Sequence, residues 1–195
     1  MPVSTPPAAL EPPLLDSESF RQPIDFIRVD HERQAEICSW LEACAGREDS
    51  QAIASAAQPL LRFFTEDLPR HALDEEEDLF PLLRQRCAPE DGIERVLDQL
   101  SHEHLLDKDL VGFLVEDLEA LAARLQLPHA IRFFINLKAF AMTQVRHLAW
   151  ENTTVLPLAE RRLSSDDLAA LTRSLAGRRG FSPRDLSPRG LPPGD

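Results

Sequence analysis

Apolar residues recur at spacings of three, four or seven positions from Ile24 onward, as expected for helices with one buried face. No convincing strand-like alternation of apolar and polar residues is found. The pattern breaks near Gly46, at "APEDG" (88–92) and at "LPH" (127–129), and this predicts four long helices. Ser164 begins a possible capping box, S-S-D-D, for a short fifth helix that ends near Gly177.

Four long helices joined by short turns predict an all-α, up-down-up-down four-helix bundle over residues 24–177. The first 23 residues contain six prolines, and the segment from Gly180 to the end contains four. Residues 1–23 are therefore expected to form a disordered arm and residues 178–195 a disordered tail.

Polar residues interrupt the predicted apolar stripes at matching places. "HALDEEEDLFP" (71–81) and "HLAWENTTVLP" (147–157) share the pattern H-x3-E-x5-P, in a chain with only 6 histidines. A further histidine lies on the preceding helix in each case, which indicates an internal two-helix repeat. The inward-facing set comprises His31, His71, Glu75, His104, His147 and Glu151.

Helical geometry allows each histidine and the glutamate four positions later to reach one centre, because they lie about 6 Å apart along the axis on one face. An unpaired ionised glutamate in a helical core would cost several kcal/mol, so compensating cations are favoured. Imidazole and carboxylate ligands without thiolate suit iron, manganese or zinc, and two carboxylates suit a bridged pair of metals. A polar network without metal is the alternative.

These residues, with "DHE" (30–32) and "EHLLD" (103–107), resemble the hemerythrin-like, or HHE cation-binding, family over roughly residues 24–160. The resemblance implies a non-haem di-iron centre inside a four-helix bundle. The four histidines would be terminal ligands, and Glu75 and Glu151 would bridge two iron ions together with an oxo, hydroxo or water group. Manganese or zinc is less favoured.

One position departs from the oxygen-carrying members of that family, which place two histidines four residues apart on the third helix. Leu100 and Lys108 occupy the positions four residues from His104. His102 is a poor substitute unless the register shifts, because two residues turn a helical side chain by about 200°. The chain therefore resembles the bacterial members with four histidines and two carboxylates, which are linked to nitric oxide, oxygen and iron–sulfur cluster repair.

Charge and composition restrict the classes of molecule that the protein is expected to bind. The net charge of −12 and the pI near 4.9 argue against nucleic acid or an anionic membrane as the main partner. No apolar run is long enough to span a membrane, and three cysteines without metal-ligand spacing fit a reducing compartment. We therefore expect a cytoplasmic protein. A small diatomic ligand, oxygen or nitric oxide, is the expected partner.

Three functions remain open. The first is a di-iron protein that binds a diatomic ligand for sensing, scavenging or repair of iron centres. The second is an oxidase, peroxidase or nitric oxide reductase that uses the same centre. The third is a regulatory interaction module in which metal only stabilises the bundle.

Several charged residues near the motifs have less specific interpretations. The acidic run Glu76–Asp78 is expected to be a solvated helix face, although Glu76 could accept a hydrogen bond from a ligand histidine. Glu32 and His129 are expected at the surface. The arginines of the tail could dock a protein partner, but a disordered end is the preferred interpretation.

Overall fold

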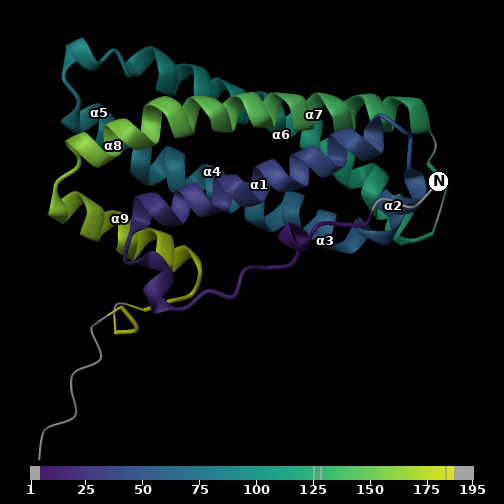
Figure 1. Ribbon diagram of the computed structural model, residues 1–195, viewed down its shortest axis with the longest axis horizontal. Helices are drawn as coiled ribbons and strands as arrows, with labels where there is room; N and C mark the ends of the chain where they lie inside the picture. The colour runs from purple at the N-terminus through teal and green to yellow at the C-terminus, as the bar shows by residue number, and fades with distance from the viewer. Residues whose placement is uncertain (1–4, 125, 128, 183, 187–195) are drawn as a thin grey trace, which may run out of the picture.

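The computed structural model describes residues 5–124, 126–127, 129–182 and 184–186. Four antiparallel helical segments form a bundle, as Figure 1 shows, and the predicted all-α, up-down-up-down fold is confirmed. The first and third segments are α1 (Pro23–Ala45) and α6 (Glu94–Ala122), the latter preceded by η5 (Pro89–Asp91). The second comprises α2 (Ser50–Ser55), α3 (Ala57–Arg62), η3 (Phe63–Asp67), α4 (Leu68–Asp74), η4 (Glu75–Leu79) and α5 (Phe80–Arg86). The fourth comprises α7 (Ala130–Trp150), η6 (Glu151–Val155) and α8 (Leu156–Arg162).

A fifth helix, α9 (Ser165–Arg178), packs against one end of the bundle (Figure 1). Ser164 caps α9, because its side chain accepts a hydrogen bond from the Asp167 amide while Asp167 accepts one from the Ser164 amide. The predicted capping box and the short extra helix are therefore confirmed.

Three prolines follow single turns of π-helix in the second and fourth segments. Pro69, Pro81 and Pro157 each come directly after a residue whose N–H bonds to the carbonyl five positions earlier. Proline has no N–H, and its ring would clash with the carbonyl four positions earlier in a regular α-helix, so the wider π turn relieves the clash. Two of these turns begin at Glu75 and Glu151, the two glutamates of the repeat.

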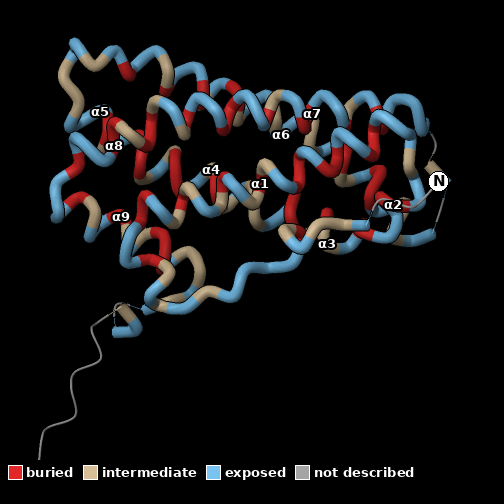
Figure 2. Tube along the Cα trace, viewed as in Figure 1, coloured by how far each residue is buried: buried red, intermediate tan, exposed pale blue. Residues whose placement is uncertain are grey.

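The apolar core is divided into two separate clusters. One lies around Phe64, Leu114 and Phe140, and the other around Phe20, Leu83 and Leu156. Along α1 the second cluster ends at Ile27 and the first begins at Ile37. The other three segments show the same gap between the two clusters. Buried polar residues, 1% or less exposed in the case of His31 and Gln34, occupy this layer. Figure 2 shows that buried positions recur along the helices of the bundle.

The described part of the N-terminal arm is packed, so the expectation of a disordered arm is corrected from residue 5 onward. Two short 3-10 helices, η1 (Ala8–Leu10) and η2 (Ser17–Phe20), bury the side chains of Leu10 and Phe20 against the bundle. Arg33 and Arg62 donate hydrogen bonds to backbone carbonyls of the arm, and Thr172 of α9 donates to the carbonyl of Phe20. Residues 1–4 lie outside the described residues.

The acidic run after His71 is not simply solvated, which corrects a second expectation. Arg178 at the end of α9 contacts Asp74, Glu77 and Asp78, and Arg179 contacts Asp74 at 2.6 Å. These two arginines, expected in a disordered tail, therefore hold α9 against the helix that carries His71. Residues 187–195 of the expected tail lie outside the described residues.

Candidate metal centre

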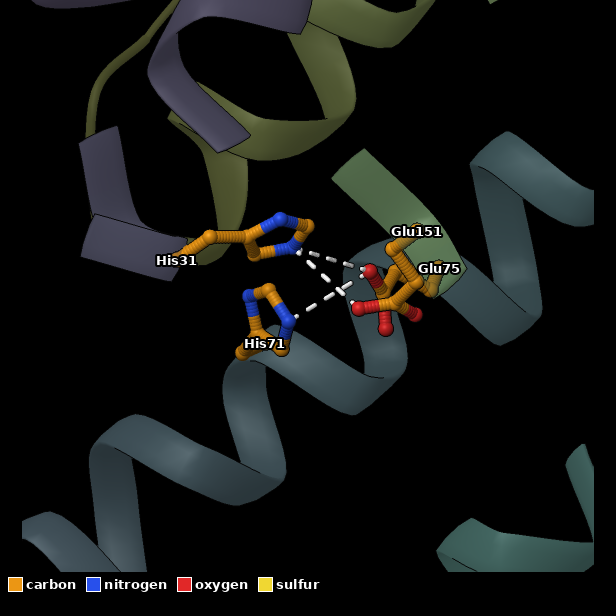
Figure 3. Close-up of side chains that lie close together, drawn as sticks. All are labelled: His31, His71, Glu75 and Glu151. Atoms are coloured by element: carbon orange, nitrogen blue, oxygen red, sulfur yellow. Dashed lines mark ion pairs between the residues drawn. The ribbon is translucent and has the colours of Figure 1, made fainter. Parts of the chain in front are cut away.

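The six residues predicted from the sequence meet in the polar layer between the two core clusters. His31 comes from α1, His71 from α4, His104 from α6 and His147 from α7, while Glu75 and Glu151 begin η4 and η6. The side chains of His31, Glu75 and Glu151 are 0% exposed, whereas that of His104 is 15% exposed. Figure 3 shows His31, His71, Glu75 and Glu151 converging.

Each glutamate divides its two oxygens between two groups of histidines. Oε1 of Glu75 lies 3.5 Å from Nε2 of His31 and 3.3 Å from Nε2 of His71, while its Oε2 lies 3.4 Å from Nε2 of His104. Oε2 of Glu151 lies 3.4 Å from Nε2 of His31, and its Oε1 lies 3.0 Å from Nε2 of His147. Two four-residue groups that could each hold a metal ion therefore share both carboxylates.

The inward-facing atoms have no hydrogen-bond partner among the described residues. This holds for both oxygens of Glu75 and of Glu151 and for Nε2 of His31, His71 and His147. Buried polar atoms are rarely left without a partner, because removing them from water is costly. Seven such atoms aimed at one another match the donor set of metal cations, so the residues present fit a metal-binding centre.

The outward nitrogen of each histidine, in contrast, has an oxygen acceptor on another helix. Nδ1–H of His71 donates to Asp30 at 3.0 Å and that of His104 to Glu76 at 2.7 Å. In the same way His147 donates to Glu103 at 3.1 Å and His31 to Asn152 at 2.8 Å. In the neutral imidazole these bonds fix the tautomer whose Nε2 can bind a metal.

The acceptors form a closed ring around the bundle. Asp30 of α1 accepts from the histidine of α4, and Glu76 of η4 accepts from the histidine of α6. Glu103 of α6 accepts from the histidine of α7, and Asn152 of η6 accepts from the histidine of α1, which closes the ring. Every acceptor is the sequence neighbour of a candidate ligand, so it points sideways along the helix surface toward the next helix.

The histidines and glutamates of the centre shift one another's pKa values. Burial lowers the pKa of His104, but contact with Glu75 and the hydrogen bond to Glu76 outweigh it and raise the pKa to about 10. Burial favours neutral Glu75, yet the charge of His71 and contacts with His104 and His31 hold the Glu75 pKa well below its usual range. Protons therefore balance the carboxylates where cations are absent.

The remaining residues considered from the sequence lie elsewhere. His102, His129 and Glu32 are exposed, so within the described chain His104 is the histidine that α6 brings to the centre. Sequence reasoning identified Glu76 as a possible acceptor but missed Asp30, Glu103 and Asn152. Their signal was the acidic or amide residue directly beside each candidate ligand.

Comparison with known proteins agrees with this geometry. A family model described as "Hemerythrin HHE cation binding domain" matches residues 22–159. Searches of the curated proteins and of the solved structures gave no match. No helix in the described ranges is long and apolar enough to cross a membrane. Residues 22–159 make up most of the chain and contain all six converging residues, and the chain therefore belongs to the hemerythrin HHE cation-binding domain family.

Proposed function

We propose that this chain is a non-haem di-iron protein that binds a diatomic ligand, oxygen or nitric oxide, for sensing, scavenging or supply of iron to damaged centres. The observation that carries the proposal is the division of each glutamate's oxygens between two groups of histidines. A carboxylate so placed suits a bridge between two cations better than a ligand of one.

In this proposal His31 and His71 would hold one ion, His104 and His147 would hold the other, and Glu75 and Glu151 would be shared by both. Iron would supply reversible binding or reduction of the diatomic ligand. The histidine-rich donor set, which contains no thiolate, favours iron over the softer metals. Each ion would receive two nitrogens and two oxygens from the chain, which leaves open positions for a small molecule.

The chain's own residues keep the centre ready for a ligand. The four outward hydrogen bonds orient the imidazoles, and the two apolar clusters limit the entry of water on both sides. His104 is the most exposed of the six residues, so we infer that small molecules approach from its side.

Metal analysis tests this proposal. Protein reconstituted with ferrous iron should hold about two iron ions per chain, as expected for a di-iron bundle, with charge-transfer bands after exposure to air. The double variant Glu75→Gln/Glu151→Gln should lose the paired centre. Glu66→Gln, an exposed glutamate of η3, is the matched control and should load normally. Fewer than about one iron per reconstituted wild-type chain would overturn the proposal.

Anaerobic titration of the reduced, iron-loaded protein then separates the roles. Reversible spectral changes with oxygen or nitric oxide support a sensor or scavenger. Steady consumption of oxygen, peroxide or nitric oxide with a reductant would instead indicate an enzyme. Unchanged activity in cells of a folded, metal-free double variant would indicate a regulatory module.

A further inference from the structure

A cavity of about 810 Å³ opens between the η3–α4 segment and α6, beside the candidate metal centre. Its buried floor includes Phe64, His71 and Gln144, and its exposed rim includes Leu73 and Leu105. His104, the most exposed of the converging residues, also lines it. The cavity therefore leads from the surface to two of the four candidate histidine ligands.

The size of this cavity exceeds the needs of a diatomic ligand. Sites for organic molecules have volumes of about 300–1,000 Å³ and are lined mainly by apolar side chains with a few polar groups. Most of the lining is apolar, including Leu68, Ala72, Val111 and Val115. An organic molecule with a substantial apolar portion fits this description.

Asp107 is the partly buried carboxylate of this cavity to which the described residues offer no hydrogen bond. Glu76, in contrast, is bound by His104 and Ser101. Asp107 lines the cavity three residues after His104 on α6. Burial raises the pKa of Asp107. Asp107 is thus an acceptor available to a ligand.

We propose that the cavity binds a neutral, largely apolar organic molecule that carries a hydroxyl group, with the hydroxyl donating to Asp107 near His104. The inference rests on the proposed di-iron centre and names the class of molecule that reaches it. A carboxylate ligand would be repelled by Asp107 and Glu76, whereas Lys108 of the same lining is exposed to solvent. An ammonium ligand would lose its hydration in the apolar cavity.

Four probes that share a butylphenyl group and differ in their polar substituent test whether the cavity prefers a hydroxyl group. We would titrate iron-loaded protein with 4-butylphenol, 4-butylanisole, 4-butylbenzoate and 4-butylbenzylamine by calorimetry. 4-Butylphenol should bind most tightly, about tenfold or more above the anisole, because a hydrogen bond to a charged acceptor contributes that much. Equal binding of the phenol and the anisole, or tighter binding of either charged probe, would overturn the proposal.

Variants locate the binding in this cavity. Val111→Phe and Val115→Phe add bulk to the wall and should each weaken 4-butylphenol binding at least about tenfold, as overpacking of an apolar site predicts. Leu106→Phe adds similar bulk to an exposed position of α6 outside the lining, and it should leave the affinity unchanged. Asp107→Leu should reduce the affinity for 4-butylphenol to that for 4-butylanisole.

Iron content and helical content are measured on every sample. A wild type that retains iron but does not bind 4-butylphenol, or wall variants that bind it as tightly as the wild type does, overturns the cavity proposal alone. A wild type that binds the phenol in the cavity but holds little iron overturns the proposed di-iron function alone.

Discussion

The Nδ1 atom of His31 lies 2.8 Å from the amide oxygen of Asn152. The other three histidines of the centre donate to carboxylates instead. Glu76 follows Glu75 in the sequence, as Asn152 follows Glu151. At this acceptor position the two halves of the repeat therefore differ by one charge. A carboxylate acceptor makes an imidazole a stronger donor to metal.

The variant Asn152→Asp should therefore tighten metal binding in the half that contains His31, by about tenfold. Competition with a chelator of known affinity measures this. Thr153→Asp places the same charge on the next, exposed residue and is the control. Equal effects of the two variants would contradict the contact-based explanation.

Metal loading should release protons, and metal affinity should rise with pH. The pKa of His104 is raised to about 10 in the metal-free protein, so His104 is protonated at pH 7 and must lose its proton to bind a cation. The affinity should increase roughly tenfold per pH unit for each proton displaced, up to the raised pKa. Calorimetry at pH 7 in buffers of different ionisation enthalpy counts the protons. No dependence on the buffer would refute this expectation.

The ion pairs of α9 should matter for stability. Arg179→Gln leaves the Asp74 carboxylate, 1% exposed, with Arg178 as its remaining cationic partner. Loss of this charge-assisted hydrogen bond, with Arg178 still compensating the carboxylate, should lower the free energy of unfolding by about 2 kcal/mol. Arg173→Gln changes an exposed arginine of the same helix, and denaturant unfolding of that control should match the wild type.

The π turn at Glu75 should depend on Pro81. In Pro81→Ala the new N–H can bond to the carbonyl of Glu77, which permits a regular α turn and rotates Glu75 away from its present position. We expect metal binding to weaken by roughly tenfold with helical content retained. Circular dichroism measures the helical content, and competition with a chelator measures the metal affinity. Pro89→Ala, in the exposed turn before α6, is the control and should leave both unchanged. Unaltered affinity would show that the proline does not position the glutamate.

The bundle and the convergence of the six residues could be predicted because both follow from local spacing. A histidine and a glutamate four positions apart share one helix face, and the repeated motif places two such faces opposite one another. The packing of residues 5–22 could not be predicted, since single residues such as Leu10 and Phe20 have no period. The same holds for Arg178, whose acidic partners are about 100 positions away in the chain.

The ring of acceptors could be predicted only in part. Asp30 and Glu103 are visible beside His31 and His104 in the sequence, but each serves a histidine on a different helix. Which neighbour each acceptor serves depends on the order of the helices around the bundle.

The division of the apolar core gives the centre a role in cooperativity. Phe140 belongs to one cluster and Val155 to the other, and the polar layer of Gln144, His147 and Glu151 separates them along one continuous segment. Two cations held in this layer, together by residues of all four segments, would join the two apolar clusters. On metal loading, amide hydrogen exchange would then become equally slow at both ends of the bundle. The protection would increase as the metal concentration exceeds the dissociation constant of the metal.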